Sequence, residues 1–360
     1  MAAYHMHLSE TLAPVAVAGI TPTAGRRHSA LVIRPRPTSV SELFIRADLT
    51  SDMQAVEQLL LRRAQSRSEI IAAASEYTVQ AGGKRLRAAL ALLAARLGSY
   101  SLERVIHAAA SVELIHAASL VHDDLVDQAD RRRGHVTVHS RWDNDVALMV
   151  GDYFFALATS EMALSLDPRI ITFYAEAVQT IVAGELNPVT RVEPFATALR
   201  QYLYKTGCKT AALFEAAAKA GMAAGGGDDA QIAALGRYGY DMGLAFQIID
   251  DVLDFVGDER SLGKPAGNDM RQGTITLPLI YAVAGQPSAL LRTITERDDV
   301  SEADYNQAIA EVVASGAIER TLDEARVYVE RATNHLAAFP PSLAAQALVD
   351  LAFFVVDRQS

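Results

Sequence analysis

Two clusters of aspartates, each set in an apolar helical segment, constrain this chain more than any other feature of its sequence. Both have the spacing Asp-Asp-x-x-Asp: Asp123, Asp124 and Asp127 form the first, and Asp250, Asp251 and Asp254 form the second. Buried carboxylates at this density repel one another unless cations neutralise them. Residues four apart share a helix face, with Cβ atoms about 5–6 Å apart, so one cation can bridge Asp123 and Asp127. The clusters therefore predict a polynuclear metal site between two facing helices.

Basic residues follow the first cluster at once, as Arg131, Arg132 and Arg133. Guanidinium groups match the oxygens of phosphates. Hard cations such as Mg²⁺ prefer carboxylate oxygens and commonly complete their coordination with substrate phosphates. Acid, metal and base together indicate a phosphorylated substrate. The alternative for this stretch alone is an exposed, charged helix end, and the second, apolar-embedded cluster argues against it.

The rest of the chain reads as one large helical bundle. From Ser51 onward it is rich in Ala, Leu and Glu, strand-like alternation is nearly absent, and Gly or Pro turns recur between helical stretches. We predict an all-α domain of about ten helices or more over residues 41–360. Residues 1–40 contain four prolines and one acid. They predict a disordered N-terminal extension, with an organelle transit peptide or an over-long assigned start as the alternatives.

Composition excludes several classes of protein. A formal net charge of −10 over 360 residues disfavours nucleic-acid binding. The single cysteine, Cys208, excludes a disulfide framework and a cysteine-rich zinc site. It favours a reducing compartment, the cytoplasm, unless residues 1–40 direct the chain to an organelle. No uninterrupted apolar run approaches the roughly 20 residues needed to span a bilayer, so we expect no transmembrane segment.

A second basic segment, residues 81–87, has the sequence Ala-Gly-Gly-Lys-Arg-Leu-Arg. A Gly-Gly pair lets a backbone approach a ligand closely. Lys84, Arg85 and Arg87 then stand at a helix N-terminus, where free N–H groups and the helix dipole favour anions. After the second aspartate cluster, the Gly- and Pro-containing residues 263–279 predict an ordered loop that could act as a lid.

Together these motifs resemble the trans-isoprenyl (polyprenyl) diphosphate synthases. The resemblance rests on the two Asp-Asp-x-x-Asp helices, Gly-Gly-Lys-Arg-x-Arg before the first, Arg-Arg-Gly after it, and Gly-Lys-Pro-x-Gly-x-Asp after the second. It covers about residues 45–290. It implies an isoprenoid synthase fold around a central cavity, and a homodimer. It also implies a prenyltransferase that condenses isopentenyl diphosphate head-to-tail onto an allylic diphosphate, using Mg²⁺.

The resemblance further implies a role for each matching side chain. Both clusters supply the catalytic aspartates, including Asp124 and Asp251, with Asp123, Asp127 and Asp250 on the metal and Asp254 in support. The diphosphate of isopentenyl diphosphate would be held by Lys84, Arg87, His116 and Arg133. The allylic diphosphate would be contacted by Arg132, Lys209, Thr210, Gln247 and Lys264. Phe246 and Gln247 could stabilise positive charge nearby. One departure from the family pattern is Ala88, where many members have a proline that starts the helix.

Product length should depend on the space below Asp123. Ala118 and Ser119, about one helical turn earlier, are small. They predict a product of geranylgeranyl length or longer, with Phe154 and Phe155 on the next helix as a lower floor.

Two other functions remain open from the sequence. A class I terpene cyclase has no need of a second diphosphate pocket, so Lys84, Arg87 and His116 argue against it. A synthase subunit that is active only with a different partner subunit is the second alternative, and both aspartate clusters are whole here.

Overall fold

The structure is a computed structural model that describes residues 36–132, 134–257, 266–285, 287–296 and 299–357. These ranges are helical almost throughout, which confirms the predicted all-α class. Residues 1–35, and with them most of the predicted N-terminal extension, lie outside the described ranges.

The N-terminal half of the described chain contains helices α1 (Val40–Arg46), α2 (Thr50–Arg63), α3 (Glu69–Gln80), α4 (Leu86–Ala95), α5 (Leu102–Val126), α6 (Val138–Arg141), α7 (Asn144–Leu164) and α8 (Arg169–Glu185). The C-terminal half contains α9 (Phe195–Thr206), the π-helix η1 (Gly207–Ala211), α10 (Ala212–Ala224), α11 (Asp229–Val256), α13 (Asn268–Arg271), α14 (Leu277–Ala284), α15 (Ala289–Thr293), α16 (Glu302–Ala314), α17 (Ala317–His335), the 3₁₀ helix η2 (Leu336–Ala338) and α18 (Leu343–Asp357).

Two elements were not predicted. The first helix, α1, begins before Ser51, and the Ser39 hydroxyl caps it by accepting a hydrogen bond from Glu42 N at 3.1 Å. A helix this short has no clear hydrophobic period. The second is a pair of two-residue strands, β1 (Arg131–Arg132) and β2 (His135–Val136), paired antiparallel with Arg131 opposite Val136. The pairing places these arginines on a hairpin beside the end of α5 and not on the helix.

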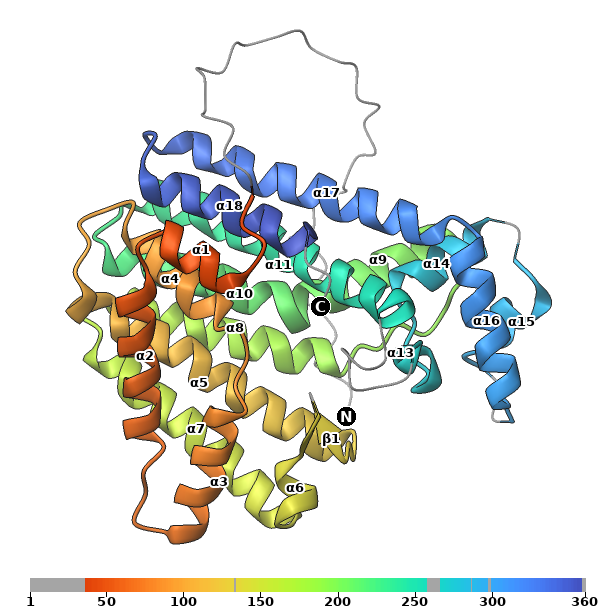
Figure 1. The fold of residues 1–360 in the computed structure, drawn as a ribbon, viewed down its shortest axis with the longest axis horizontal. Helices are drawn as coiled ribbons and strands as arrows, with labels where there is room; N and C mark the ends of the chain where they lie inside the picture. Colours follow the sequence, from red (N-terminus) through yellow and green to blue (C-terminus); the bar gives the residue numbers. More distant parts are fainter. Residues whose placement is uncertain (1–35, 133, 258–265, 286, 297–298, 358–360) are drawn as a thin grey trace, which may run out of the picture. The chain divides into compact units, whose positions relative to one another are not determined.

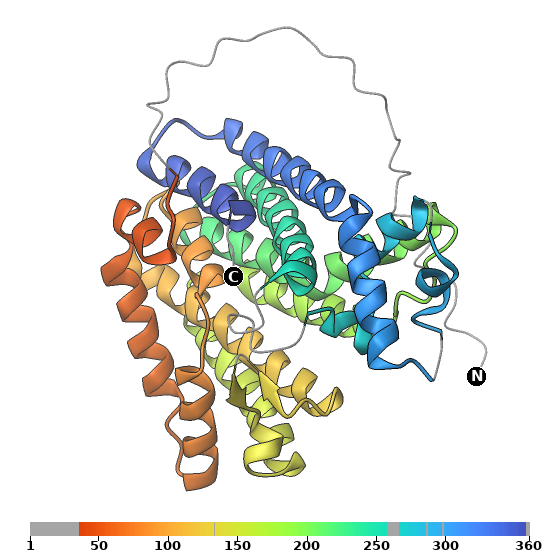
Figure 2. The same cartoon turned by 45° about the vertical axis from the view of Figure 1, so that its right-hand side comes forward.

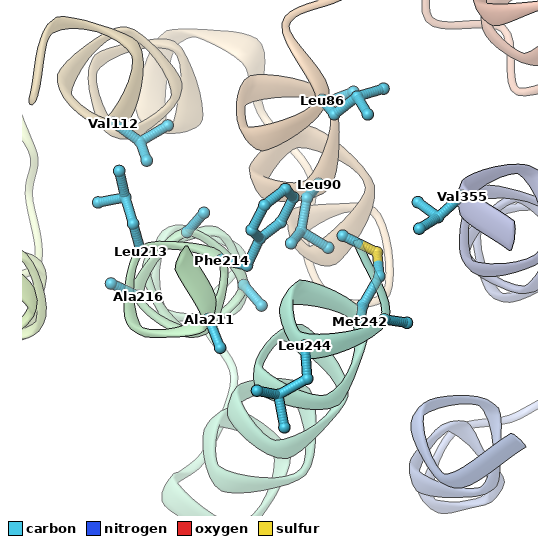
Figure 3. Close-up of a cluster of buried hydrophobic side chains, with 14 of the residues drawn as sticks. Leu86, Leu90, Val112, Ala211, Leu213, Phe214, Ala216, Met242, Leu244 and Val355 are labelled. Carbon is cyan, nitrogen blue, oxygen red and sulfur yellow. The ribbon is translucent and has the colours of Figure 1, made fainter. Parts of the chain in front are cut away.

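Helix α10 lies at the centre, between α4, α5 and α8 on one side and α11 on the other. Figure 3 shows its Phe214 directed toward Leu90 of α4, with Leu213 facing Val112 of α5. Two glycines of α11 allow its close approach to α10. A Cβ on Gly243 would lie 2.6 Å from the Ala211 Cα, and a Cβ on Gly239 would lie 2.5 Å from the Phe214 carbonyl oxygen. The α10 segment is therefore the partner that fixes where α5 and α11 stand.

The outer layers are helix pairs that run alongside one another. Helix α7 packs along α5, and α17 packs along α11 with α18 beside it, as both views show (Figures 1 and 2). Helices α5 and α7 are long and apolar enough to cross a membrane by length and composition. Core helices of soluble proteins pass the same test, and 67% of the apolar window of α5 is buried in the bundle.

Candidate active site

The π-helix η1 lies between the two aspartate-bearing helices. It contacts both α8 and α11 and leads directly into α10. Its Lys209 Nζ lies 3.7 Å from Asp123 Oδ2 of α5 and 3.3 Å from Glu185 Oε2 of α8. Single π-turns inside helices widen the turn and are frequent at functional sites. Here the turn holds Lys209 in reach of the first aspartate cluster.

Lys209 is stabilised in its protonated, positively charged form. Burial lowers the pKa of its ammonium group, but Asp123 and Glu185 outweigh burial, and the pKa is raised. The lysine is therefore a fixed cation at the edge of the first cluster, with two carboxylates as its counterions.

The next residue of η1, Thr210, connects to the second cluster. Its hydroxyl donates to Gln247 Oε1 at 2.8 Å, and Gln247 Nε2 donates to Asp251 Oδ1 at 2.9 Å. The Tyr202 hydroxyl of α9 donates to the other oxygen of Asp251 at 2.6 Å. Thr210, Gln247 and Asp251 thus form one chain of hydrogen bonds, and the neighbouring Lys209 forms the ion pair with Asp123.

The three aspartates of the second cluster have different surroundings. Asp251 and Asp254 are buried at 2% exposure each, whereas Asp250 is half-buried. Asp254 Oδ2 accepts a hydrogen bond from Asp269 N at 3.1 Å, and the Asp254 carbonyl accepts one from Gly267 N at 2.7 Å. Asp254 therefore ties the segment after α11 to the helix. Asp250 has the accessibility that a metal ligand needs.

The first cluster also contains both buried and accessible aspartates. Asp124 is buried and accepts a hydrogen bond from Arg132 Nε at 2.6 Å, which joins the hairpin to α5. Asp123 is half-buried beside Lys209, and Asp127 is the exposed C-cap residue of α5. Burial raises the pKa of Asp123 and Asp124, although Lys209 and Arg132 respectively oppose the rise.

The second basic segment lies at the start of α4. Arg87 stacks over the Phe214 ring at 4.4 Å, and Phe214 packs against Phe246 of α11 with ring centroids 5.3 Å apart. These contacts connect the predicted second diphosphate pocket to the helix that carries the second cluster. Lys84 is exposed, and His116 is half-buried on α5.

The middle residue of that motif, Arg85, faces inward. It bonds to Glu57 Oε1 at 2.7 Å and Glu113 Oε2 at 3.4 Å. We interpreted the Gly-Gly pair as room for a ligand, but at Gly82 the room is filled by Arg85 itself. A Cβ on Gly82 would lie 2.3 Å from Arg85 Nη2.

The donor set fits a hard divalent cation. The accessible side chains of the two clusters, Asp123, Asp127 and Asp250, offer only carboxylate oxygens. Within the described ranges, no group of three or more His, Cys, Asp or Glu side chains is close enough to hold a metal ion. The polynuclear site predicted from the sequence is therefore not preassembled among the described side chains.

Two predicted residues, Arg133 and Lys264, lie outside the described residues. Three partners were missed: Glu185, Tyr202 and Glu113. None of the three belongs to a recognisable motif, so no sequence signal marks it.

One pocket, of about 580 Å³, has none of the clustered aspartates in its lining. It is lined by side chains of α10, α11 and α17 around Asp241, which pairs with Arg331 at 3.0 Å and His335 at 3.2 Å. The other, about 520 Å³, lies between α1, α2 and Lys84.

Comparison with known proteins gives one consistent family. Residues 68–312 match the family model described as Polyprenyl synthetase. The protein named heptaprenyl diphosphate synthase component 2 from Geobacillus stearothermophilus is 39% identical over 311 residues, which cover 86% of this chain and 97% of that protein. Octaprenyl diphosphate synthase from Haemophilus influenzae is 35% identical over 323 residues, covering 89% of this chain and 97% of that protein.

Solved structures agree with the sequence comparisons. The polyprenyl synthase from Caulobacter crescentus CB15, complexed with calcium and isoprenyl diphosphate, superimposes with a TM-score of 0.84 at 39% identity. The match covers 91% of this chain and 100% of that one.

The buried aspartates predict a pH dependence of stability in the absence of metal. Burial raises the pKa of Asp251 well above its usual value, and Asp269 and Asp250 add to the rise. When the pKa of a carboxyl group is higher in the folded protein than in the unfolded one, the group's contribution to stability is fully present below the unfolded-state pKa, about 3.9. That contribution is lost as pH rises through the folded-state pKa.

We therefore expect the unfolding free energy of Asp251→Asn to increase relative to that of wild type as pH rises from about 4 to 7. The increase should be roughly 1.4 kcal/mol for each unit by which the fold raises the pKa of Asp251 in wild type. Urea unfolding in a chelator at several pH values measures this difference. A difference that stays constant with pH would contradict it.

Proposed function

This chain belongs to the polyprenyl synthetase family, and we propose that it joins isopentenyl diphosphate head-to-tail to an allylic diphosphate. It is a prenyltransferase, a trans-polyprenyl diphosphate synthase whose product is of geranylgeranyl length or longer. One observation carries the substrate assignment. The turn η1 places the Lys209 ammonium beside Asp123 of one aspartate helix and bonds Thr210 to Gln247 of the other, and a separate basic segment begins α4.

The allylic diphosphate is assigned to the space beside η1. Asp123, Asp127 and Asp250 would hold a divalent cation, which we propose is Mg²⁺. When bound, it neutralises the charge that develops on the leaving diphosphate. Lys209 supplies a fixed positive charge at the same place, because its ammonium lies within 4 Å of Asp123. Thr210 and Gln247 orient each other through their 2.8 Å hydrogen bond and so keep the wall of the site rigid.

The diphosphate of isopentenyl diphosphate is assigned to Lys84, Arg87 and His116. Arg87 is held in place by the Phe214 ring, and a guanidinium offers a fixed fork of donors to phosphate oxygens. A terpene cyclase has no use for this second basic site.

The reaction follows from these two positions. Lys209 would stabilise the departing diphosphate as the allylic C–O bond breaks, and a divalent cation held by the aspartates would supply further positive charge there. The double bond of isopentenyl diphosphate attacks the allylic carbocation. The ring face of Phe246 can stabilise positive charge near the reacting carbons. The released diphosphate takes the final proton, since no side chain stands out as the base.

One assay tests the proposal. Purified protein is incubated with isopentenyl diphosphate, each allylic starter and Mg²⁺, and the products are separated by chromatography. We expect chain elongation that Lys209→Ala lowers by on the order of 100-fold or more, because a charged contact to the leaving group is lost. Diphosphate release without isopentenyl diphosphate would overturn the assignment in favour of a cyclase. No turnover by the pure chain would favour dependence on a partner subunit.

Product length is the second prediction. Ala118 is fully buried and Ser119 half-buried, about 6–8 Å along α5 from Asp123. We propose that the product chain grows along this part of α5, where a phenyl ring at either position would obstruct it. We expect Ala118→Phe and Ser119→Phe to shorten the product toward farnesyl length while keeping turnover. Ala314→Phe, at an exposed position on α16, is the control. Unchanged product lengths in both variants would remove this role for α5.

We also propose that the chain forms a homodimer through α7 and α8. These neighbouring helices expose large apolar side chains: Leu148 at 43%, Met149 at 52%, Leu164 at 49%, Ile171 at 44% and Val182 at 57%. Contiguous exposed apolar surface marks interaction sites. One relative is named as component 2 of a heptaprenyl diphosphate synthase. The alternative is therefore that a different partner subunit binds this surface.

Light scattering on the purified chain distinguishes a homodimer from a chain that needs a different partner subunit. We expect a dimer mass that Met149→Asp shifts toward the monomer, because a carboxylate would be buried at the interface. Leu343→Asp, on exposed surface of α18, should leave the mass unchanged. A monomeric wild-type chain would contradict the homodimer and favour the separate subunit.

A further inference from the structure

A buried ion-pair network lies directly beneath the second basic segment. Arg85 is 10% exposed, and its guanidinium contacts Glu57 of α2, Glu113 of α5 and the Val79 carbonyl at 2.8 Å. Glu113 is 3% exposed. Its other oxygen, Oε1, accepts a hydrogen bond from Ala88 N at 3.0 Å. One carboxylate therefore holds both Arg85 and the first turn of α4.

This arrangement replaces an ordinary helix cap. Arg85 is the N-cap residue of α4, and its side chain makes no capping hydrogen bond. A usual N-cap side chain accepts from the N–H two or three residues on. Here Glu113, from another helix, accepts from that position instead, and its negative charge also suits a helix N-terminus.

The backbone of Arg85 shows that the network determines the path of the loop. Its φ is 50° and ψ is 35°, the left-handed region that residues other than glycine rarely adopt. That conformation costs on the order of 1 kcal/mol and persists only where surrounding contacts fix it. The contacts that fix it are those of the guanidinium, and Gly82 leaves the space that the guanidinium occupies.

We propose that Glu113 is a positioning residue for the isopentenyl diphosphate site, acting through Arg85 and the first turn of α4. Lys84 precedes Arg85 directly, and Arg87 follows it by two residues in that first turn. The position of the Arg85 backbone therefore determines the backbone positions from which the Lys84 and Arg87 side chains extend. The proposal rests on the assignment of Lys84 and Arg87 to that substrate.

Glu113→Gln separates the two contacts of Glu113. The amide keeps an oxygen for Ala88 N and keeps the side chain's size, but it removes the charge that faces Arg85. We expect KM for isopentenyl diphosphate to rise about tenfold or more, as for the loss of one charge-assisted hydrogen bond. KM for the allylic diphosphate and kcat should stay within about twofold.

The matched control is Glu161→Gln. Glu161 is a fully buried carboxylate on α7 that pairs with His107 at 2.7 Å and with Arg63. It is also a buried acid in an ion-pair network, but it does not contact α4 in any described interaction. Its loss should lower the unfolding free energy without raising KM for isopentenyl diphosphate selectively.

Gly82→Ala tests the same network from its other side. The added methyl group would displace the Arg85 guanidinium, so the variant should show the same selective rise in KM. Combined with Glu113→Gln, the two effects should be less than additive, because both act through Arg85.

The outcomes are distinct. If wild type fails to elongate any starter, the proposed function itself fails. If wild type is active but both variants raise the two KM values equally, or lower only thermal stability, then Glu113 is a structural residue and the inference is overturned. If Glu113→Gln does not fold, Gly82→Ala decides the question by the same comparison of the two KM values.

Discussion

The structure depends on neutralising carboxylates that the helices bury. Arg132 pairs with the buried Asp124, and Tyr202 and Gln247 donate hydrogen bonds to the buried Asp251. The buried aspartates join the surrounding elements to the two helices, and Asp123, Asp127 and Asp250 are the more accessible members of the clusters. The buried aspartates therefore have a structural role, and the accessible ones are those proposed above to hold a cation.

The helix packing supports this division because α10 stands between the two clusters. The glycines of α11 bring it against α10, and the π-turn η1 begins that same central helix. A shift of α10 would therefore move Phe214 together with Lys209 and Thr210 of η1, and Thr210 is hydrogen-bonded to Gln247 of α11. Since Phe214 also contacts Arg87, the two diphosphate positions proposed above would both depend on where α10 lies.

The aspartate spacing and the helical pattern could be read directly from the sequence, because both are local properties of the chain. The roles of adjacent residues with the same chemistry could not. Arg85 and Arg87 are alike in sequence, yet one is buried between two glutamates and the other stacks on an aromatic ring. That difference is set by Glu57, Glu113 and Phe214, which come from three other helices. The short strands β1 and β2 and the short helix α1 were missed because elements of this length show no recognisable hydrophobic period.

The counterions of Lys209 bear on the order of events at the site. Its ammonium is shared between Asp123 and Glu185. A carboxylate that binds a divalent cation can no longer neutralise a lysine as strongly. Cation binding at Asp123 would thus loosen one of the two tethers and make the ammonium available to an arriving anion.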